Sequence, residues 1–334
     1  ACSIFAALSG SSPATCAAIG KMGIPEMRKR GVPDDLATGS ICAGGTLGIL
    51  IPPSITMIVY GVATETSIGR LFLAGVVPGI MLTVFFIGWA LFIAWRRDYR
   101  FADTTKRFSL RERFEVLPKV FPFVLIIIGI LYVLYGGVAT PSEAAGVGAL
   151  FCVVLVVVIY RMWQPRRLWE IFRESTRESV MIMMIIAASE LFGYMMSSLY
   201  VTQSVAESIA AMEVNRWVLM LMINLFLLVA GCFLPPVAII LMTAPILYPI
   251  VTHSGFDPYW FAVILTINME IGLITPPVGL NLFVINGIAP DVRLPVILRG
   301  ALPFVLLMAF GIVLLCFFPG IATWLPDLLM GPVK

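Results

Sequence analysis

The chain has 334 residues, of which 60% are hydrophobic and only 12% are charged. Soluble domains carry about 25% charged residues, so this composition excludes a soluble protein and predicts an integral membrane protein. Several apolar runs are about 20 residues long, which suits membrane-spanning helices rather than barrel strands. The net charge of +3 at pH 7 indicates no particular partner.

The first predicted element is a re-entrant hairpin in residues 1–20. Gly10 and Pro13 divide this apolar segment, and neither half reaches the roughly 17 residues that a span needs. A basic loop is expected at 21–30. Residues 34–63 are apolar again but contain the pair Pro52-Pro53. Proline cannot continue a helix without clashing with the preceding turn, so this segment predicts a broken helix.

The middle of the chain predicts ordinary spans. A short loop holding Glu65 and Arg70 leads into an uninterrupted apolar run at 71–95. Further spans are expected at 118–135, 144–160 and 179–197, with polar, basic connections at 96–117 and 161–177 and an amphipathic surface segment at 199–214.

The last third of the chain repeats the first. Residues 216–252 are apolar but interrupted between Gly231 and Pro236, which predicts a second hairpin. Residues 258–289 predict a second broken helix, because Gly272-Leu273-Ile274-Thr275-Pro276-Pro277 repeats the pattern Gly48-Ile49-Leu50-Ile51-Pro52-Pro53. A final span is expected at 295–318.

The basic residues test this layout. With residues 21–30 in the cytoplasm, every Lys and Arg except Arg70, Arg216 and Lys334 falls on the cytoplasmic side, in agreement with the positive-inside rule. The first hairpin then enters from the cytoplasm and the second from outside, and the two broken helices run in opposite directions. The two hairpin and broken-helix units are therefore predicted to be inverted repeats, an arrangement of secondary transporters.

The hairpin tips and helix breaks are the candidate site. Unwound backbone at membrane depth lines a cavity or is buried in protein. Its oxygens suit hard cations, and helix N-termini attract anions; the alternative is helix packing through small residues. The candidate substrate- or ion-binding residues are Ser9, Gly10, Ser11, Ser12, Thr15, Gly45, Thr46, Gly48, Pro52, Pro53, Ser54, Gly231, Pro235, Glu270, Gly272, Thr275, Pro276, Pro277, Gly279 and Asn281.

Few other residues suggest chemistry. Glu270, beside the second break, is a candidate for ion coupling or for holding the unwound segment, and a structural role is equally open. Glu190 favours a structural role, and His253 is expected in a solvated outer loop. The six cysteines lie in apolar segments without CxxC spacing, which predicts buried free thiols. The sequence has no nucleotide-binding motif and no nucleophile–base or metal-ligand set, so a secondary carrier is favoured over an enzyme.

Four motifs in order carry a resemblance over essentially the whole chain. They are Ser9-Gly10-Ser11-Ser12-Pro13-Ala14, the segment 44–54, Ala139-Thr140-Pro141-Ser142-Glu143-Ala144, and the segment 271–279. With them the chain resembles the large membrane subunit of tripartite ATP-independent periplasmic (TRAP) transporters. That family normally carries further helices before the first hairpin. Because this chain begins inside an apolar segment, we expect upstream sequence to be missing.

The resemblance implies an all-α, elevator-type importer of organic anions in the bacterial inner membrane. Its implied partners are a small four-helix membrane subunit and a soluble periplasmic binding protein. Na⁺ is the implied coupling ion, near Ser11, Ser12, Gly45, Thr46, Gly231 and Thr275. The implied transport domain comprises 1–63 and 179–289, with scaffold and arm helices in 64–178 and a C-terminal scaffold helix in 290–334.

The substrate stays open, because C4-dicarboxylates, sialic acid and keto acids all suit a small cavity of hydroxyls and backbone. No Lys or Arg lies near either break, so bound cations would supply the positive charge that an anion needs. Two other functions remain possible from the sequence: a sodium/anion symporter of similar fold that needs no binding protein, and a channel.

Overall fold

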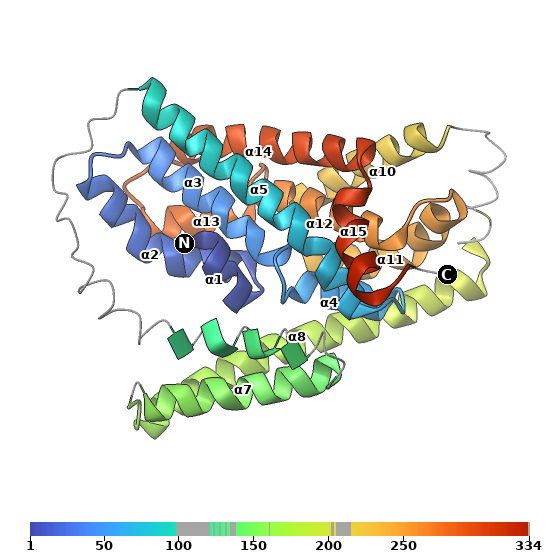
Figure 1. Ribbon diagram of the computed structural model, residues 1–334, viewed down its shortest axis with the longest axis horizontal. Helices are drawn as coiled ribbons and strands as arrows, with labels where there is room; N and C mark the ends of the chain where they lie inside the picture. The colour runs from blue at the N-terminus through green and yellow to red at the C-terminus, as the bar shows by residue number, and fades with distance from the viewer. Residues whose placement is uncertain are drawn as a thin grey trace. The chain divides into compact units, whose positions relative to one another are not determined.

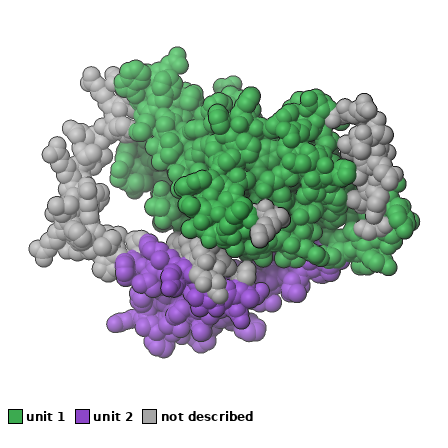
Figure 2. All heavy atoms as spheres, turned by 45° about the vertical axis from the view of Figure 1, so that its right-hand side comes forward, with its two compact units in different colours: residues 1–104, 189–334 green, residues 105–188 purple. Residues whose placement is uncertain are grey.

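The structure is a computed structural model that describes residues 1–97, 121–122, 124–126, 128–130, 132–133, 138–159, 161–201, 204 and 215–332. Within these residues every regular element is a helix. The chain divides into two compact units, a larger one of residues 1–104 and 189–334 and a smaller one of residues 105–188 (Figure 2).

The first part of the larger unit contains the predicted hairpin, broken helix and span (Figure 1). The elements are α1 (Cys2–Ser9), α2 (Ser12–Lys29), α3 (Asp34–Thr46), the 3₁₀ helix η1 (Leu47–Ile49), α4 (Ile55–Ala63) and α5 (Ile68–Arg96). The interruptions expected at Gly10 and at Pro52-Pro53 are confirmed, because no helix continues through either.

The second part of the larger unit repeats this order. Its elements are α10 (Arg216–Phe233), α11 (Pro236–His253), α12 (Pro258–Leu273), α13 (Leu280–Ile288), α14 (Leu294–Phe317) and α15 (Gly320–Met330). The breaks at Pro235 and at Pro276-Pro277 are confirmed, and both Pro-Pro peptide bonds, at Pro52-Pro53 and Pro276-Pro277, are cis. The sequence reading did not anticipate α15.

The smaller unit contains α7 (Pro141–Val158) and the first part of α8 (Pro165–Ser198). A capping box starts α7: the Glu143 N–H donates to the Thr140 hydroxyl at 3.4 Å, and the Thr140 N–H donates to the Glu143 carboxylate at 2.8 Å. The span predicted at 118–135 is described only in part. Most of the segments predicted at 96–117 and 199–214 lies outside the described residues.

Three sequence predictions about connections are wrong. The segment 21–30, expected as a basic loop, is helical to Lys29, because Arg28 and Lys29 in its last turn complement the helix dipole and Arg30 pairs with Glu26 at 2.8 Å. Arg70, expected in a loop, lies in α5, whose N-cap is the Ser67 side chain.

The basic segment 161–177 is the third case. It was expected as a connection, but α8 begins at Pro165 and runs without interruption into the predicted span 179–197. Pro165 is tolerated at a helix start, and the segment after it contains no further proline or glycine before Gly193. The charged segment and the apolar segment are therefore one helix of 34 residues.

Helix α12 lies in the core of the larger unit. Every residue from Trp260 to Leu273 is buried, and α12 packs against α10, α5 and α14. Helix α3 packs along α14, where Gly39 meets the backbone of Gly300 so closely that a Cβ on either glycine would clash. Both broken helices are thus held by neighbours inside the same unit.

The later halves of the two broken helices exchange partners. Helix α4, after the first break, packs on α11 of the second hairpin, and α13, after the second break, packs on α2 of the first hairpin. The first and second parts of the larger unit are therefore joined by two helix–helix contacts, α4 with α11 and α13 with α2.

Candidate functional site

The first hairpin turns at Gly10 and Ser11. Gly10 has a left-handed conformation with φ of 58°, which glycine adopts without strain. The hydroxyls of Ser9 and Thr15 lie 2.6 Å apart, and each lies within hydrogen-bond distance of the Ser11 carbonyl oxygen, at 3.1 and 2.8 Å. The structure therefore brings the predicted hydroxyl-bearing residues of this tip together.

The first break lies against this tip. The Ile55 N–H, at the start of α4, donates to the Gly10 carbonyl oxygen at 3.4 Å. A Cβ on Gly48 would lie 2.7 Å from the Ser11 carbonyl oxygen and 2.9 Å from the Thr15 hydroxyl, so only glycine lets η1 approach the hairpin this closely. The tip and the break form one contact surface made largely of backbone.

Ser54 fixes the far side of the first break. Its hydroxyl donates to the Ile49 carbonyl oxygen at 2.5 Å and accepts from the Met57 N–H at 3.2 Å, so one side chain closes η1 and caps α4. Ser54 is fully buried. Both hydrogen bonds of the Ser54 hydroxyl therefore stabilise the local fold. The sequence alone could not distinguish this structural role from ion binding.

Thr46 is turned away from the tip. Its hydroxyl donates to the Ala43 carbonyl oxygen at 2.7 Å and lies 3.9 Å from the sulfur of Met308 on α14. The backbone beside it faces the hairpin instead, because the Gly45 carbonyl oxygen accepts from the Ser12 hydroxyl at 3.1 Å.

The second hairpin meets the second break in the same manner. The Val278 N–H donates to the Cys232 carbonyl oxygen at 3.1 Å, as the Ile55 N–H does to Gly10. A Cβ on Gly272 would collide with the Gly231 backbone, so α10 and α12 touch there through backbone atoms. The predicted pair Gly231 and Gly272 is thus brought together.

This second contact offers fewer free oxygens. The Thr275 hydroxyl donates to the Ile271 carbonyl oxygen at 2.6 Å, within the last turn of its own helix. Gly279 starts α13 in a left-handed conformation with φ of 51° and no side-chain cap. Pro276 and Pro277 are exposed, and Pro235 is exposed at the hairpin tip.

One chain of hydrogen bonds joins the two halves of the molecule. The Asn281 side-chain amide, on α13, donates to the Ser12 hydroxyl at 3.0 Å, and Ser12 donates to the Gly45 carbonyl oxygen. Asn281 and Ser12 are fully buried, and the amide oxygen Oδ1 of Asn281 has no hydrogen-bond partner in the described structure. A buried acceptor without a donor is costly, so this oxygen is a candidate ligand for a bound group.

Glu270 is the second unpaired acceptor. Its side chain is 0% exposed, and neither carboxylate oxygen has a hydrogen-bond partner among the described residues. A buried charge needs a proton, a cation or hydrogen bonds to offset its desolvation. The sequence reading singled out this residue, and its neighbour Asn268 donates to Asn224 on α10 at 2.6 Å, a pairing that the reading missed.

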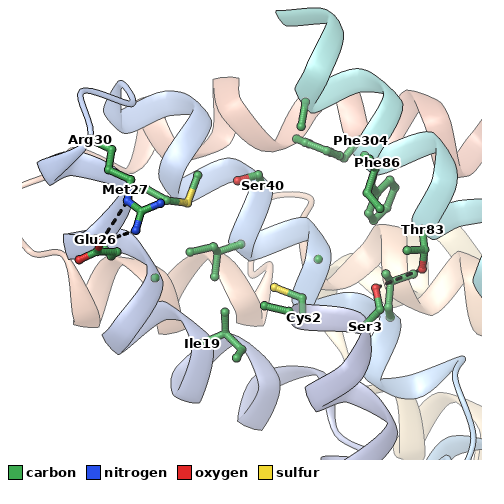
Figure 3. Close-up of a pocket in the computed structure, with 17 residues that line it drawn as sticks. Cys2, Ser3, Ile19, Glu26, Met27, Arg30, Ser40, Thr83, Phe86 and Phe304 are labelled. Atoms are coloured by element: carbon green, nitrogen blue, oxygen red, sulfur yellow. Dashed lines mark hydrogen bonds and ion pairs between the residues drawn. The ribbon is translucent and has the colours of Figure 1, made fainter. Parts of the chain in front are cut away.

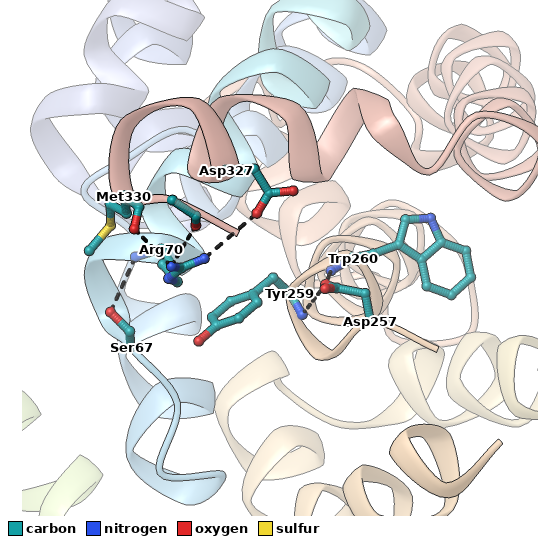
Figure 4. Close-up of polar contacts among 8 residues, drawn as sticks. Ser67, Arg70, Asp257, Tyr259, Trp260, Asp327 and Met330 are labelled. Atoms are coloured by element: carbon teal, nitrogen blue, oxygen red, sulfur yellow. Dashed lines mark hydrogen bonds and ion pairs between the residues drawn. The ribbon is translucent and has the colours of Figure 1, made fainter. Parts of the chain in front are cut away.

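Arg70 is a structural residue that the sequence reading left without a role (Figure 4). Its guanidinium donates to the carbonyl oxygens of Met330 and Gly331 at 3.0 and 2.7 Å, and it lies 3.7 Å from Asp327 and 5.9 Å from the centre of the Tyr259 ring. It therefore fastens the end of α15, where the helix dipole favours a cation, to the start of α5.

A pocket of about 440 Å³ lies elsewhere in the larger unit (Figure 3). The ion pair of Glu26 with Arg30 borders it, as does the 3.1 Å hydrogen bond between the hydroxyls of Ser3 and Thr83. None of the predicted site residues lines it, so the candidate site is the tip-and-break contacts and not this pocket.

These helices define a multi-pass integral membrane protein. Five described helices are long and apolar enough to cross a membrane. They are α5, α8 over Pro165–Met196, α10, α11 and α14. The arms predicted for the second hairpin, α10 and α11, are among them.

Comparison with known proteins gives the family. A family model described as the tripartite ATP-independent periplasmic transporter, DctM component, matches residues 1–321. The C4-dicarboxylate TRAP transporter large permease protein DctM of Pseudomonas aeruginosa is 40% identical over 327 residues, which are 98% of this chain and 76% of that protein. The chain belongs to the DctM family of TRAP transporter permeases, and it is a transporter component rather than an enzyme.

Two further relatives are named for other compounds. The sialic acid TRAP transporter large permease protein SiaM of Vibrio cholerae is 32% identical over 328 residues, 98% of this chain and 76% of that protein. The ectoine/5-hydroxyectoine TRAP transporter large permease protein UehC of Ruegeria pomeroyi is 34% identical over 333 residues, with the same coverage of 98% and 76%.

Proposed function

We propose that this chain is the substrate-moving subunit of a sodium-coupled secondary importer of small organic anions. The observation that carries the proposal is the buried chain from Asn281 through Ser12 to the Gly45 carbonyl, with the unpartnered Asn281 oxygen at its end. It joins the first hairpin tip, the first break and the helix that follows the second break.

The oxygens at this tip fit Na⁺. The Asn281 oxygen has no donor among the described residues, the Ser12 hydroxyl oxygen keeps one lone pair beyond its two hydrogen bonds, and the Gly45 carbonyl oxygen lies 3.1 Å from that hydroxyl. Hard cations take carbonyl and hydroxyl oxygens as ligands. When bound, Na⁺ would supply positive charge inside the unit, and these three residues would hold it.

A sodium site at the second tip has weaker support. Thr275 uses its hydroxyl within its own helix, so Gly231 and the neighbouring unwound segment offer chiefly backbone carbonyls. We keep the predicted site near Gly231 and Thr275 as a proposal that needs a movement of the tip to expose those carbonyls.

The substrate class follows from charge. None of the predicted tip and break residues is a Lys or Arg, so bound Na⁺ is the source of positive charge for a carboxylate. The relative from Pseudomonas aeruginosa, named for C4-dicarboxylates, makes these the first acids to test. Sialic acid and ectoine follow, from the names of the other two relatives.

The exchange of partners between the halves supports inverted repeats. In an inverted-repeat transporter each half contributes equivalent elements to one central site. Here α13 packs on α2 and α4 packs on α11, and each hairpin tip accepts one N–H from the break of its own half. We propose that 1–63 and 179–289 form the domain that moves in the transport cycle, and that 64–178 and 290–334 form the scaffold and arm.

The partners follow from the family description. A tripartite periplasmic transporter requires a periplasmic binding protein and a further membrane component, so we propose a soluble binding protein and a small membrane subunit for this chain. We also propose residence in a bacterial inner membrane, with the side of the predicted layout that is rich in Lys and Arg facing the cytoplasm.

Uptake into proteoliposomes tests the proposal. The chain is reconstituted with its small subunit, and uptake of labelled C4-dicarboxylates is measured with and without a sodium gradient and the binding protein. We expect uptake that needs both. Uptake that needs sodium alone identifies a stand-alone symporter, and single-channel currents identify a channel; either result overturns the proposal.

A pair of serine variants tests the site. Ser12→Ala removes the hydroxyl between Asn281 and Gly45, and we expect the sodium concentration for half-maximal uptake to rise about tenfold, which corresponds to roughly 1.4 kcal/mol. Ser40→Ala on α3 is the control, because among the described residues the Ser40 hydroxyl makes only a 3.4 Å hydrogen bond to the Ala37 carbonyl oxygen of its own helix. Equal sodium dependence in both variants would contradict the assignment of Ser12.

A further inference from the structure

One carboxylate of α8 lies well inside the predicted membrane span. The span covers residues 179–197, which correspond to about 29 Å of helix and match the roughly 30 Å hydrocarbon core of a bilayer. Glu190 is about 16 Å from the first end of this span and about 10 Å from the other. Its side chain is too short to reach the head groups, as Lys and Arg side chains do near helix ends. A charged group therefore lies at the depth of the acyl chains.

Glu190 has no partner within the described part of the chain. Its side chain is exposed, and no described residue forms an ion pair or hydrogen bond with it. An acidic side chain inside the hydrocarbon core is costly, and those that occur pair with other charged or polar groups or face water. Because Glu190 lies on an exposed side of an apolar helix segment, a group outside the described residues must offset its charge.

Glu190 belongs to a stripe with the spacing of a helix–helix contact. Met183, Ala187, Glu190 and Tyr194 follow one another at intervals of four, three and four residues, which places them on one side of α8. All four are exposed, Met183 to 68% and Tyr194 to 73%. Ala187, about one turn before the carboxylate, leaves room for a neighbouring helix to approach closely. We call these four residues the Glu190 stripe.

A different side of α8 is already covered by protein. Ser189 is buried, and Gly193 meets α11, where a Cβ added to Gly193 would lie 3.5 Å from the ring of Pro245. This contact fixes the rotation of α8 about its own axis. The Glu190 stripe is therefore turned away from α11 and is bare among the described residues.

We propose that the Glu190 stripe binds a transmembrane helix of the small membrane subunit, and that a Lys or Arg of that helix pairs with the Glu190 carboxylate. Opposite charges attract strongly in a medium of low dielectric constant, so one pair fixes both the depth and the rotation of the partner helix. Acyl chains could cover Met183 and Tyr194 but offer nothing to a carboxylate. The inference rests on the small subunit of the proposed function and adds where that subunit binds.

Association of the two subunits in lipid vesicles tests it. The labelled chain and the labelled small subunit are reconstituted at several protein-to-lipid ratios, and energy transfer between the labels gives the dissociation constant. Glu190→Ala leaves the partner's charge unpaired inside the core, so we expect the dissociation constant to rise about 100-fold, or about 2.8 kcal/mol. Glu178→Ala is the matched control, because Glu178 is also exposed on α8 but precedes the span, and we expect a change below about threefold.

Charge exchange separates a direct pair from a general loss of structure. Glu190→Arg is combined, in turn, with replacement by Glu of each Lys and Arg in the spans of the small subunit. One combination should restore the dissociation constant to within about threefold of the wild type.

Four other outcomes would overturn the inference. Three leave the rest of the proposed function standing: no combination restores binding, Glu190→Ala binds as tightly as Glu178→Ala, or Glu190→Ala weakens only the association between two copies of this chain. The fourth, a wild type that does not associate with the small subunit, overturns the proposed partner as well.

Discussion

The two helix breaks share a sequence pattern but differ in their surroundings. At the first break Pro52 and Ser54 are buried, and the Ser54 side chain both closes η1 and caps α4. At the second break Pro276 and Pro277 are exposed, and α13 starts at Gly279 without a side-chain cap. The same motif is thus largely buried in the first half and exposed in the second.

The difference lies in the neighbours and not in the motif. In the first half the second arm of the hairpin, α2, packs along α3, and both arms contact η1 at the break, whereas in the second half the first arm, α10, packs along α12. The first break is therefore held more closely by its neighbours than the second.

The largest expected effect is at the glycine contact of the second half. Gly272→Ala places a methyl group into the Gly231 backbone, so α10 must separate from α12. Overpacking of this kind costs about 1–3 kcal/mol of stability, and displacement at a site costs on the order of 100-fold in activity. Thermal unfolding and initial uptake rates measure the two effects.

Gly231→Ala is the matched control for this contact. The nearest atom to its added Cβ, on Gly272, would lie 3.4 Å away, which is an ordinary van der Waals distance. We expect the uptake rate of this variant to stay within about threefold of the wild type, about 0.65 kcal/mol. If both glycine variants lose uptake equally, the contact is not asymmetric and the argument for Gly272 fails.

A smaller effect is expected from removing the hydroxyl group at each break, and its size should differ between the two breaks. Ser54→Ala removes an N-cap and leaves the Ile49 carbonyl without its donor, so we expect a loss of about 2 kcal/mol. Thr275→Val removes one bond inside a helix turn, and we expect a loss of about 1 kcal/mol. The unfolding midpoints of the two variants measure the difference, and a larger loss in Thr275→Val would reverse our ranking of the breaks.

The smallest effect concerns an ion pair that joins the halves at their surface. Arg28, at the end of α2, forms an ion pair with Asp291, between α13 and α14, at 2.9 Å, and this guanidinium holds the pKa of Asp291 below its usual value. A carboxyl group with a lowered pKa stabilises the fold above its unfolded pKa, and the contribution disappears as the pH falls through the folded pKa.

Asp291→Asn tests this linkage. We expect the variant to be slightly less stable than the wild type at pH 7, and the difference to vanish as the pH falls through the lowered pKa of Asp291, because both proteins then carry a neutral side chain. The unfolding midpoint at several pH values, in low and high salt, is the measurement. A difference that persists at acid pH would show that Asp291 acts through something other than its charge.

Much of this arrangement could be predicted from the sequence. The pairs Pro52-Pro53 and Pro276-Pro277 interrupt helices for a local reason, the absence of an N–H and the clash of the ring with the preceding turn, so both breaks were predictable. The helical continuity of 21–29 and 165–198 was not, because charge was taken as a sign of a loop, although Arg and Lys are good helix formers.

Other features depend on contacts between distant segments. The bond from Asn281 to Ser12 and the pairing of Asn268 with Asn224 require a packing that no local pattern specifies. The reading named Ser54 and Thr46 for their hydroxyl groups, but whether a hydroxyl is free depends on the carbonyl that it meets, Ile49 or Ala43 in these cases. Residue type alone could not separate ligands from caps.

The close approach of Gly39 to Gly300 constrains how the larger unit can deform. Where α3 crosses α14, main chain rests on main chain without intervening side chains that could change rotamer to allow sliding. A shift of one helix along the other would drive the side chain of Ser40 or Arg299 into the opposing backbone. The crossing therefore resists sliding of α3 along α14 more than a contact between flexible side chains would.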